Sequence, residues 1–253
     1  AGDTDDNTLN VTRGHSGTTA TTHADNAIVI VAKGNESSDD DYVGWSRPSA
    51  LTTKTQIRLW SHDNFGEDLL INPRDDAIFY WDRTNNLSTR AVNISTLAGA
   101  NEVPIIAKQV LVSDKDRHVI AFGCNPQGST IQDPLLIRFS NQESPAEWEA
   151  KATNTAGDLR LGSGSGFVQA VETKREILIW TDSSLHSMQF IGPPFTFGIN
   201  QISSSITIMS SNAAIGTEEI VYWMGLDTFY LYAQNQIQQL PCTVKDKVFL
   251  DFN

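Results

Sequence analysis

The stretch at 218–240 places the tightest constraint on the fold. Two runs within it, 220–224 and 228–232, are rich in β-branched and aromatic side chains. Short groups of turn-forming residues, 225–227 and 233–235, follow the runs. This alternation of short runs and turns is typical of antiparallel strands joined in a meander. We therefore predict strands here and no helix.

Three weaker copies of the pattern lie upstream. Each pairs two candidate strands across a polar turn or loop: 69–71 with 77–82, 118–123 with 135–140, and 176–181 with 185–190. Such units, recurring at intervals of roughly 40–60 residues, are the signature of propeller blades. We predict an all-β fold of repeated antiparallel β-meanders, a β-propeller or part of one, with a β-sandwich as the alternative. Because propellers close with about 4–8 blades, four units make either a small ring or part of a larger one.

The composition argues against several classes of protein. The 253 residues carry a formal net charge of −12, which opposes non-specific binding to nucleic acid or to an anionic membrane. A hydrophobic fraction of 40% indicates a folded chain. No apolar run approaches the ~20 residues of a membrane span. Cys124 and Cys242 lack the spacing of a metal site, so we expect both to be small residues in or near the core.

Composition also divides the chain into three parts. Residues 1–33 read as the end of a small β module, with two strands around a loop. Residues 34–44 are polar and acidic, typical of a linker or an exposed loop. Residues 45–253 form the propeller-like domain. We expect that domain to be incomplete, because the sequence ends at Phe252-Asn253, directly after a strand-like run at 248–250.

An acidic cluster in the linker is the candidate interface. Asp39, Asp40 and Asp41 precede Tyr42, without the alternating ligands and central glycine of a calcium loop. The cluster is therefore read as a solvated acidic face, with docking to a basic partner surface as the alternative.

A histidine, two aspartates and a glutamate lie close together after a predicted strand at 56–60. His62, Asp63, Glu67 and Asp68 crowd into a stretch that we interpret as a polar loop. Paired carboxylates catalyse reactions when a cleft separates their pKa values, and neighbours in a loop give no sign of such a cleft. We predict no catalytic, cofactor-binding or metal-binding residue, and no enzyme activity.

A set of turn and core phrases runs through residues 45–253. They are Trp60 with 65–70, Pro73-Arg74, 78–82, 138–140 with Trp148, 153–157, 177–182, 222–225 with 229–230, and 240–242. Together they resemble a widespread family of tailed-bacteriophage virion proteins. The segment 8–24 resembles the end of a small β domain that is common in phage tail proteins.

Members of that family are tail nozzle or tail stabilisation proteins, built around β-propellers and arranged as rings below the portal. The resemblance implies a structural protein of the virion tail that forms a homo-oligomeric ring. Its expected partners are other tail and portal-adaptor proteins, and it implies no cofactor. Viral DNA would pass through without specific binding during genome ejection, because negative walls repel phosphate.

Two other functions stay open. A propeller that binds or cleaves host-surface glycans would need two carboxylates ~5–10 Å apart in a pocket to hydrolyse them, and Asp63, Glu67 and Asp68 are the candidates. A secreted adhesin domain would suit the four Asn-x-Ser/Thr patterns of the chain.

Overall fold

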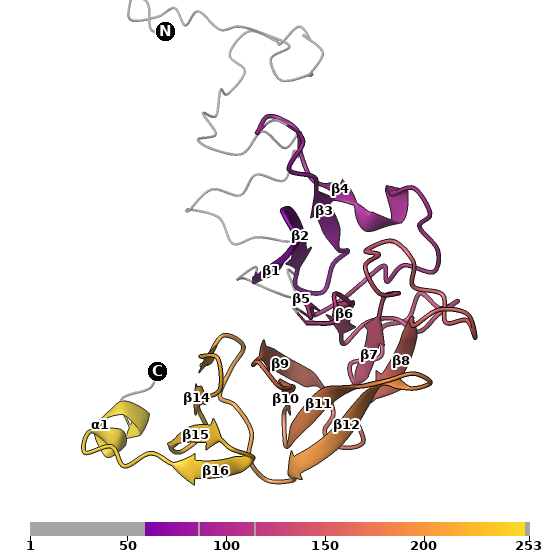
Figure 1. Cartoon of the computed structure of the whole chain (residues 1–253). Helices are drawn as coiled ribbons and strands as arrows, with labels where there is room; N and C mark the ends of the chain where they lie inside the picture. The colour runs from indigo at the N-terminus through magenta and orange to yellow at the C-terminus, as the bar shows by residue number, and fades with distance from the viewer. Residues whose placement is uncertain (1–58, 86, 114, 251–253) are drawn as a thin grey trace, which may run out of the picture. The chain divides into compact units, whose positions relative to one another are not determined.

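The computed structural model describes residues 59–85, 87–113 and 115–250, which belong to one compact unit beginning at Ile57. Within these ranges, sixteen strands form four antiparallel sheets of four strands each, always in sequential order. The prediction of an all-β fold of repeated meanders is confirmed. We call the sheets blades 1 to 4, and Figure 1 shows them following one another around a common axis.

Each blade is a run of four consecutive strands. Blade 1 comprises β1 (Trp60–Phe65), β2 (Asp68–Pro73), β3 (Phe79–Trp81) and β4 (Val92–Asn93). Blade 2 comprises β5 (Gln109–Val112), β6 (Val119–Phe122), β7 (Leu136–Phe139) and β8 (Gly157–Arg160). Blade 3 comprises β9 (Phe167–Glu172), β10 (Ile177–Thr181), β11 (Leu185–Gly192) and β12 (Thr196–Ser203). Blade 4 comprises β13 (Ala214–Gly216), β14 (Val221–Met224), β15 (Phe229–Ala233) and β16 (Gln236–Gln239).

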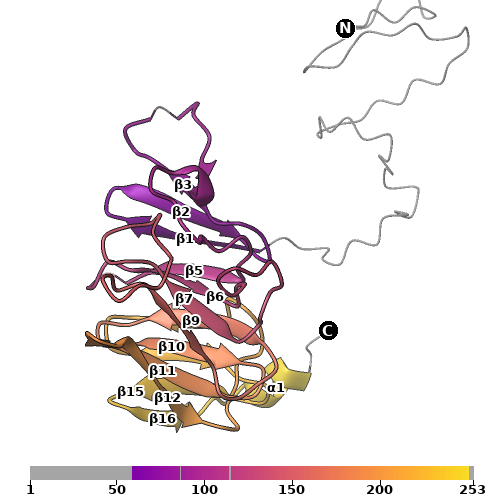
Figure 2. The same ribbon diagram turned by 90° about the vertical axis from the view of Figure 1, so that its right-hand side faces the viewer.

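The first strands of the blades are the ones that meet near the axis. Strand β1 contacts β5, β5 contacts β9, and β9 contacts β13. In Figure 1 the strands of blade 1 step outward from the centre in sequence order. Figure 2 shows blades 1, 2 and 3 as successive layers, with blade 4 overlapping blade 3 in this view. This is the arrangement of propeller blades.

Three apolar cores join the four sheets. Strand β10 is buried along its whole length: Ile177 and Ile179 enter the core shared with blade 2, whereas Leu178 and Trp180 enter the core shared with blade 4. Strand β6 divides its residues in the same way between blades 1 and 3. Because successive side chains of a strand point to opposite faces, a strand in a sheet between two neighbours carries apolar residues toward both of them.

Tight turns set the register of the hairpins. Gln234 and Asn235, with φ of 51° and 61°, connect the paired residues Ala233 and Gln236. Positive φ at both central residues is what a type I′ turn requires. Gly66, with φ of 70°, begins the turn between β1 and β2. The predicted turn at 233–235 is thus confirmed.

Two predicted elements differ from the structure. The stretch at 61–68 is not a polar loop, because residues 61–65 belong to β1 and a short turn leads directly into β2. The run at 248–250 is not a strand but lies in α1 (Lys245–Leu250), where the Val248 amide donates to the Val244 carbonyl at 3.0 Å. Neither helix in the described ranges, α1 or the 3₁₀ turn Ile94–Thr96, has the length and hydropathy of a membrane span.

Replacing Ile179 by alanine should destabilise the domain strongly. The side chain is fully buried between blades 2 and 3, so we expect a loss of about 2–5 kcal/mol in the free energy of unfolding. Ile191→Ala is the matched control, because Ile191 is 57% exposed in the β11–β12 hairpin and should change stability by less than about 0.5 kcal/mol. Urea denaturation followed by tryptophan fluorescence measures both changes. Equal effects would contradict this assignment of the core.

Candidate functional site

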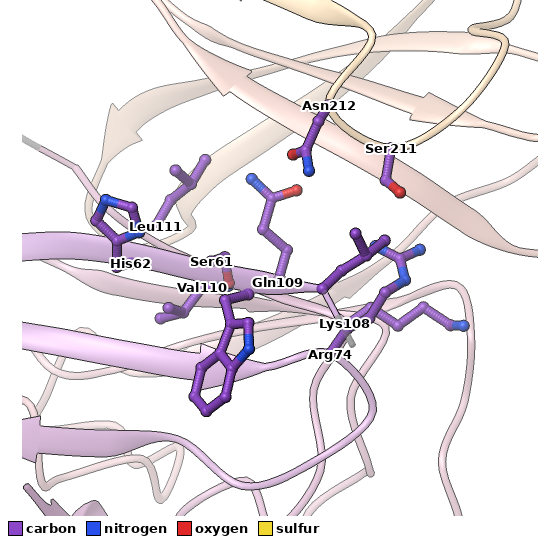
Figure 3. Close-up of a pocket in the computed structure, with 11 residues that line it drawn as sticks. Ser61, His62, Arg74, Lys108, Gln109, Val110, Leu111, Ser211 and Asn212 are labelled. Atoms are coloured by element: carbon purple, nitrogen blue, oxygen red, sulfur yellow. The ribbon is translucent and has the colours of Figure 1, made fainter. Parts of the chain in front are cut away.

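A polar pocket of about 200 Å³ lies where the first strands of blades 1 and 2 face the loop that leads into blade 4. Figure 3 shows the side chains that line it, which come from β1, β5, the residues just before these strands, the residue after β2 and the loop before β13. Seven of the lining residues carry hydrophilic side chains: Ser61, His62, Arg74, Lys108, Gln109, Ser211 and Asn212.

Two polar side chains of β1 join the first strands of blades 1 and 2. The Ser61 hydroxyl accepts a hydrogen bond from the Val110 amide at 3.0 Å, and a carboxylate oxygen of Asp63 accepts one from the Val112 amide at 2.8 Å. Both donors belong to β5, which among the described strands pairs with β6 alone. Side chains therefore take the place of a backbone ladder between the blades, which explains why this polar sequence forms a strand.

Blade 3 is tied to the other two blades in the same manner. The Gln109 amide donates to the Ala170 carbonyl at 2.8 Å and accepts from the Ala170 amide at 2.9 Å. The Arg74 guanidinium, just after β2, donates to the carbonyls of Val168 at 3.2 Å and Phe167 at 3.4 Å. Burial lowers the pKa of Arg74, and a neighbouring aspartate opposes that shift.

The charges of the pocket suit a small anion better than acid–base catalysis. Its lining includes the cations Arg74 and Lys108 and no carboxylate. Lys108 also pairs with Asp75, at 3.3 Å between the ammonium nitrogen and the carboxylate. Glycoside hydrolysis needs a pair of carboxylates, which this lining does not offer.

The structure separates the carboxylates that lie together in the sequence. Asp63 bonds to blade 2, as described above. Asp68 accepts hydrogen bonds from the Tyr80 hydroxyl and from the Arg83 amide, the latter at 2.9 Å. Glu67 forms an exposed ion pair with Arg83. None of the three carboxylates lines the pocket, and each holds a strand or a turn in place.

The remaining candidates from the sequence are the acidic interface, a metal site and the cysteines. The predicted interface lies outside the described residues: Asp39, Asp40, Asp41 and Tyr42. The predicted β module at 1–33 and the predicted linker at 34–44 lie outside them as well. In the ranges that the structure describes, no group of three or more His, Cys, Asp or Glu side chains could hold a metal ion. Cys124 is a buried free thiol, as predicted, and burial raises its pKa to about 12.

Glu176, at the boundary of blades 3 and 4, is a buried carboxylate that no sequence pattern marked. One of its oxygens accepts from the Tyr232 hydroxyl at 2.7 Å, and the other accepts from the Ser187 hydroxyl and from the Gln189 amide, at 3.2 Å. Burial first, and then Glu176 itself, raises the pKa of Tyr232 well above its usual range. Tyr232 lies 56 positions away in sequence, so no local pattern could have marked the pair.

A buried histidine stands at the boundary of blades 2 and 3. The His118 ring lies 5.2 to 6.3 Å from the ring centroids of Phe139, Phe190 and Phe197. Its Nε2 atom lies 3.1 Å from the Thr155 hydroxyl, whereas its Nδ1 atom is buried without a hydrogen-bond partner. Burial lowers the pKa of His118, and nearby Asp116 opposes that shift. Protonation would bury a charge among aromatic rings, so the neutral form is favoured.

Tyr232→Phe should weaken the junction of blades 3 and 4. It removes one hydrogen bond to a buried carboxylate, for which we expect a loss of about 1.5–3 kcal/mol in the free energy of unfolding. Tyr222→Phe is the matched control, because Tyr222 is 38% exposed on the other face of blade 4. Chemical denaturation of both variants tests the assignment, and indistinguishable midpoints would refute it.

Acidification should destabilise the domain through His118. The unfolded chain protonates this residue near its ordinary pKa of 6.5, whereas the folded protein holds the pKa lower. The unfolded state therefore binds more protons as the pH falls below that value, so stability present above it is progressively lost. Urea midpoints compared between about pH 7.5 and about pH 5.5 measure the slope. His118→Gln should flatten it relative to His62→Gln, because His62 is an exposed residue of β1, and an unchanged slope would contradict the assignment.

Comparisons with known proteins give distant matches of fold. No protein-family model and no curated protein matches the sequence. Among solved structures, Hsv2 of Kluyvelomyces marxianus has a TM-score of 0.40 at 6% identity, over 72% of this chain and 47% of that one. Hsv2 with loop 6CD replaced by a Gly-Ser linker also has a TM-score of 0.40 at 6% identity, over 70% and 49%. The extracellular domain of the one-component system BT4673 from B. thetaiotaomicron has a TM-score of 0.32 at 13% identity, over 72% and 27%. The chain thus spans about half or less of these proteins, and the likeness is to β-propellers in fold alone.

Proposed function

We propose that the chain is a structural component of a bacteriophage tail, in a nozzle or stabilisation ring, that acts by assembling with other proteins. The main support for this proposal is that polar side chains near the axis form hydrogen bonds between blades. Ser61, Asp63, Arg74 and Gln109 all bond to the backbone of another blade. Carboxylates used in this way maintain a shape and do not form the pair that a hydrolase requires.

The resemblance to phage tail proteins supports the same role. Its phrases coincide with residues of the cores: Trp148 is buried in the core between blades 1 and 2, and Trp180 and Trp223 are buried in the core between blades 3 and 4. A protein whose recognisable phrases are turns and core segments, without a catalytic signature, would contribute through its surface and its shape. The proposed partners are further copies of the chain and other tail and portal-adaptor proteins of the virion.

Antibodies raised against the purified chain test the proposal directly. Immunogold electron microscopy of particles of the encoding phage should label the tail, close to its junction with the capsid. An unrelated antibody of the same class is the control. If neither mass spectrometry nor labelling detects the chain in purified particles, the proposal is wrong.

The purified chain should not retard double-stranded DNA in a gel-shift assay at about 0.15 M salt. A net charge of −12 repels phosphate, and this repulsion would let DNA pass through a ring without sticking. Retention of DNA that weakens as salt is raised would contradict the prediction, because that dependence marks phosphate contacts.

A second pocket favours glycan binding as the alternative function. It has a volume of about 320 Å³ beside Glu176 and Tyr232, and its lining also includes Arg175 and Glu219. Two carboxylates, an arginine and a tyrosine are groups that hold sugars or cleave them. However, Glu176 already accepts three hydrogen bonds from the protein.

A glycan array and a hydrolysis assay separate the two functions. Under the tail-protein proposal we expect neither array binding nor sugar turnover. Specific binding or turnover that Glu219→Gln abolishes would favour the glycan function, and Glu67→Gln in the exposed β1–β2 turn is the matched control for that variant.

A further inference from the structure

Positive charge gathers in the polar pocket between blades 1 and 2 and the loop before β13, which we call the axial pocket. Its lining includes Arg74 and Lys108 and no carboxylate, whereas the whole chain carries a formal net charge of −12. The pocket is therefore a local exception to the charge of the protein. Cations that are drawn out of water are normally paired with anions, so the partners of these two decide what the pocket can bind.

The carboxylate of Asp75 lies beside both cations. It pairs with the Lys108 ammonium at 3.3 Å and accepts a hydrogen bond from the Gln132 amide at 3.0 Å. Asp75 is also the acidic neighbour of Arg74, but none of the ion pairs in the described ranges includes the Arg74 guanidinium. Two cations and one anion leave one positive charge that is not compensated.

The Arg74 guanidinium is held in place by groups that carry no charge. Its hydrogen bonds to the carbonyls of Val168 and Phe167, at 3.2 and 3.4 Å, use two of its five N–H donors. Carbonyls orient the group without cancelling its charge. The planar fork of a guanidinium matches the oxygens of a carboxylate or a phosphate. Arg74 is thus oriented in advance for an anionic partner.

The loop before β13 supplies neutral donors on the opposite side of the pocket. Figure 3 shows Asn212 on this loop pointing toward Gln109, and Ser211 on the side of Arg74. A hydroxyl and a side-chain amide can each donate a hydrogen bond to an oxyanion. An anion in the pocket would therefore meet the guanidinium on one side and neutral donors on the other.

The volume of the pocket limits the size of its ligand. About 200 Å³ is less than the ~300–1,000 Å³ of pockets that enclose drug-sized molecules. At ~30 Å³ for each water molecule, it has room for several waters, or for a small ion with part of its hydration. A nucleotide or an oligosaccharide is too large for it.

We infer that the axial pocket binds one small free oxyanion, of the class of inorganic phosphate and sulfate, between the Arg74 guanidinium and the loop residues Ser211 and Asn212. This site goes beyond the proposed function and does not depend on it. The phosphate groups of DNA share the chemistry of the ligand, but the net charge of the chain repels a polymer that carries many of them. A single small ion fits the pocket and meets its local positive charge.

Isothermal titration of the full chain with sodium phosphate, and separately with sodium sulfate, tests the inference. The ionic strength is kept constant with sodium chloride, so that a general salt effect cancels. We expect saturable binding of one ion per chain with a Kd of about 1 mM or lower. Phosphate should also raise the Tm more than chloride does at the same ionic strength, because a ligand that binds the folded state stabilises it.

Asn212→Asp places a carboxylate in the pocket at little cost to the fold. Asn212 has a φ of 68°, and aspartate tolerates this backbone region nearly as well as asparagine does. We expect this variant to raise the Kd for phosphate about tenfold or more, through repulsion between like charges. Asn235→Asp is the matched control, because Asn235 has a φ of 61°, is exposed in the β15–β16 turn and does not line the pocket.

Arg74→Gln should abolish the binding of phosphate, because it removes the uncompensated charge. Arg74 also bonds to blade 3, so a urea midpoint verifies that this variant folds. If it does not fold, Asn212→Asp decides the test. Competition with a short single-stranded oligonucleotide separates free phosphate from the phosphate groups of nucleic acid.

Four results would overturn the inference. They are the absence of saturable binding, equal effects of chloride, equal affinities of the Asn212→Asp and Asn235→Asp variants, and displacement of phosphate by the oligonucleotide. Saturable binding that only the substitutions in the pocket weaken would support it. Neither result bears on the labelling of phage tails, so this inference and the proposed function can fail separately.

Discussion

Burial of both faces of each inner sheet is the constraint on which the structure depends. Every side chain of β10 is buried, and those of residues 177–180 enter alternately the core shared with blade 2 and the core shared with blade 4. Such a sheet cannot be stable alone, because one face would expose apolar residues to water. The same alternation in β6 makes blades 2 and 3 inseparable from their neighbours. The order of the blades in space therefore follows from their order in sequence.

A second constraint applies to the strands nearest the axis. The first strands of neighbouring blades face each other without a backbone ladder between them. Their free amides and carbonyls still need partners when buried. Ser61 and Asp63 satisfy amides of β5, and Gln109 satisfies both backbone groups of Ala170. Side-chain oxygens and amides thus fix the blades at a set separation near the axis, while apolar cores hold them farther out. Polar residues at the axis are structural here, which removes the first candidates for catalysis.

The sequence predicted the middle strands of each blade well, because residues such as those of β10 and β14 form continuous or alternating apolar runs between clear turns. It did not predict β1, whose polar residues bond to a strand 49 positions away. The short helix at Lys245–Leu250 was also missed, because its apolar residues are equally compatible with a strand. The pairing of Glu176 with Tyr232 depends on the register between distant segments. Composition and periodicity contain no information about that register.

The linear order of the three cores has a consequence for how the molecule opens. Blades 2 and 3 each pack against two neighbours, whereas in the described chain blades 1 and 4 each share a core with one. In arrays where stability is a sum of nearest-neighbour terms, the ends fray before the middle. Amide hydrogens of β6 and β10 would then exchange with solvent deuterium only through global unfolding, and those of β4 and β16 through local opening. Arg74, which bonds from blade 1 to blade 3, makes the two ends unequal, so fraying would begin at blade 4.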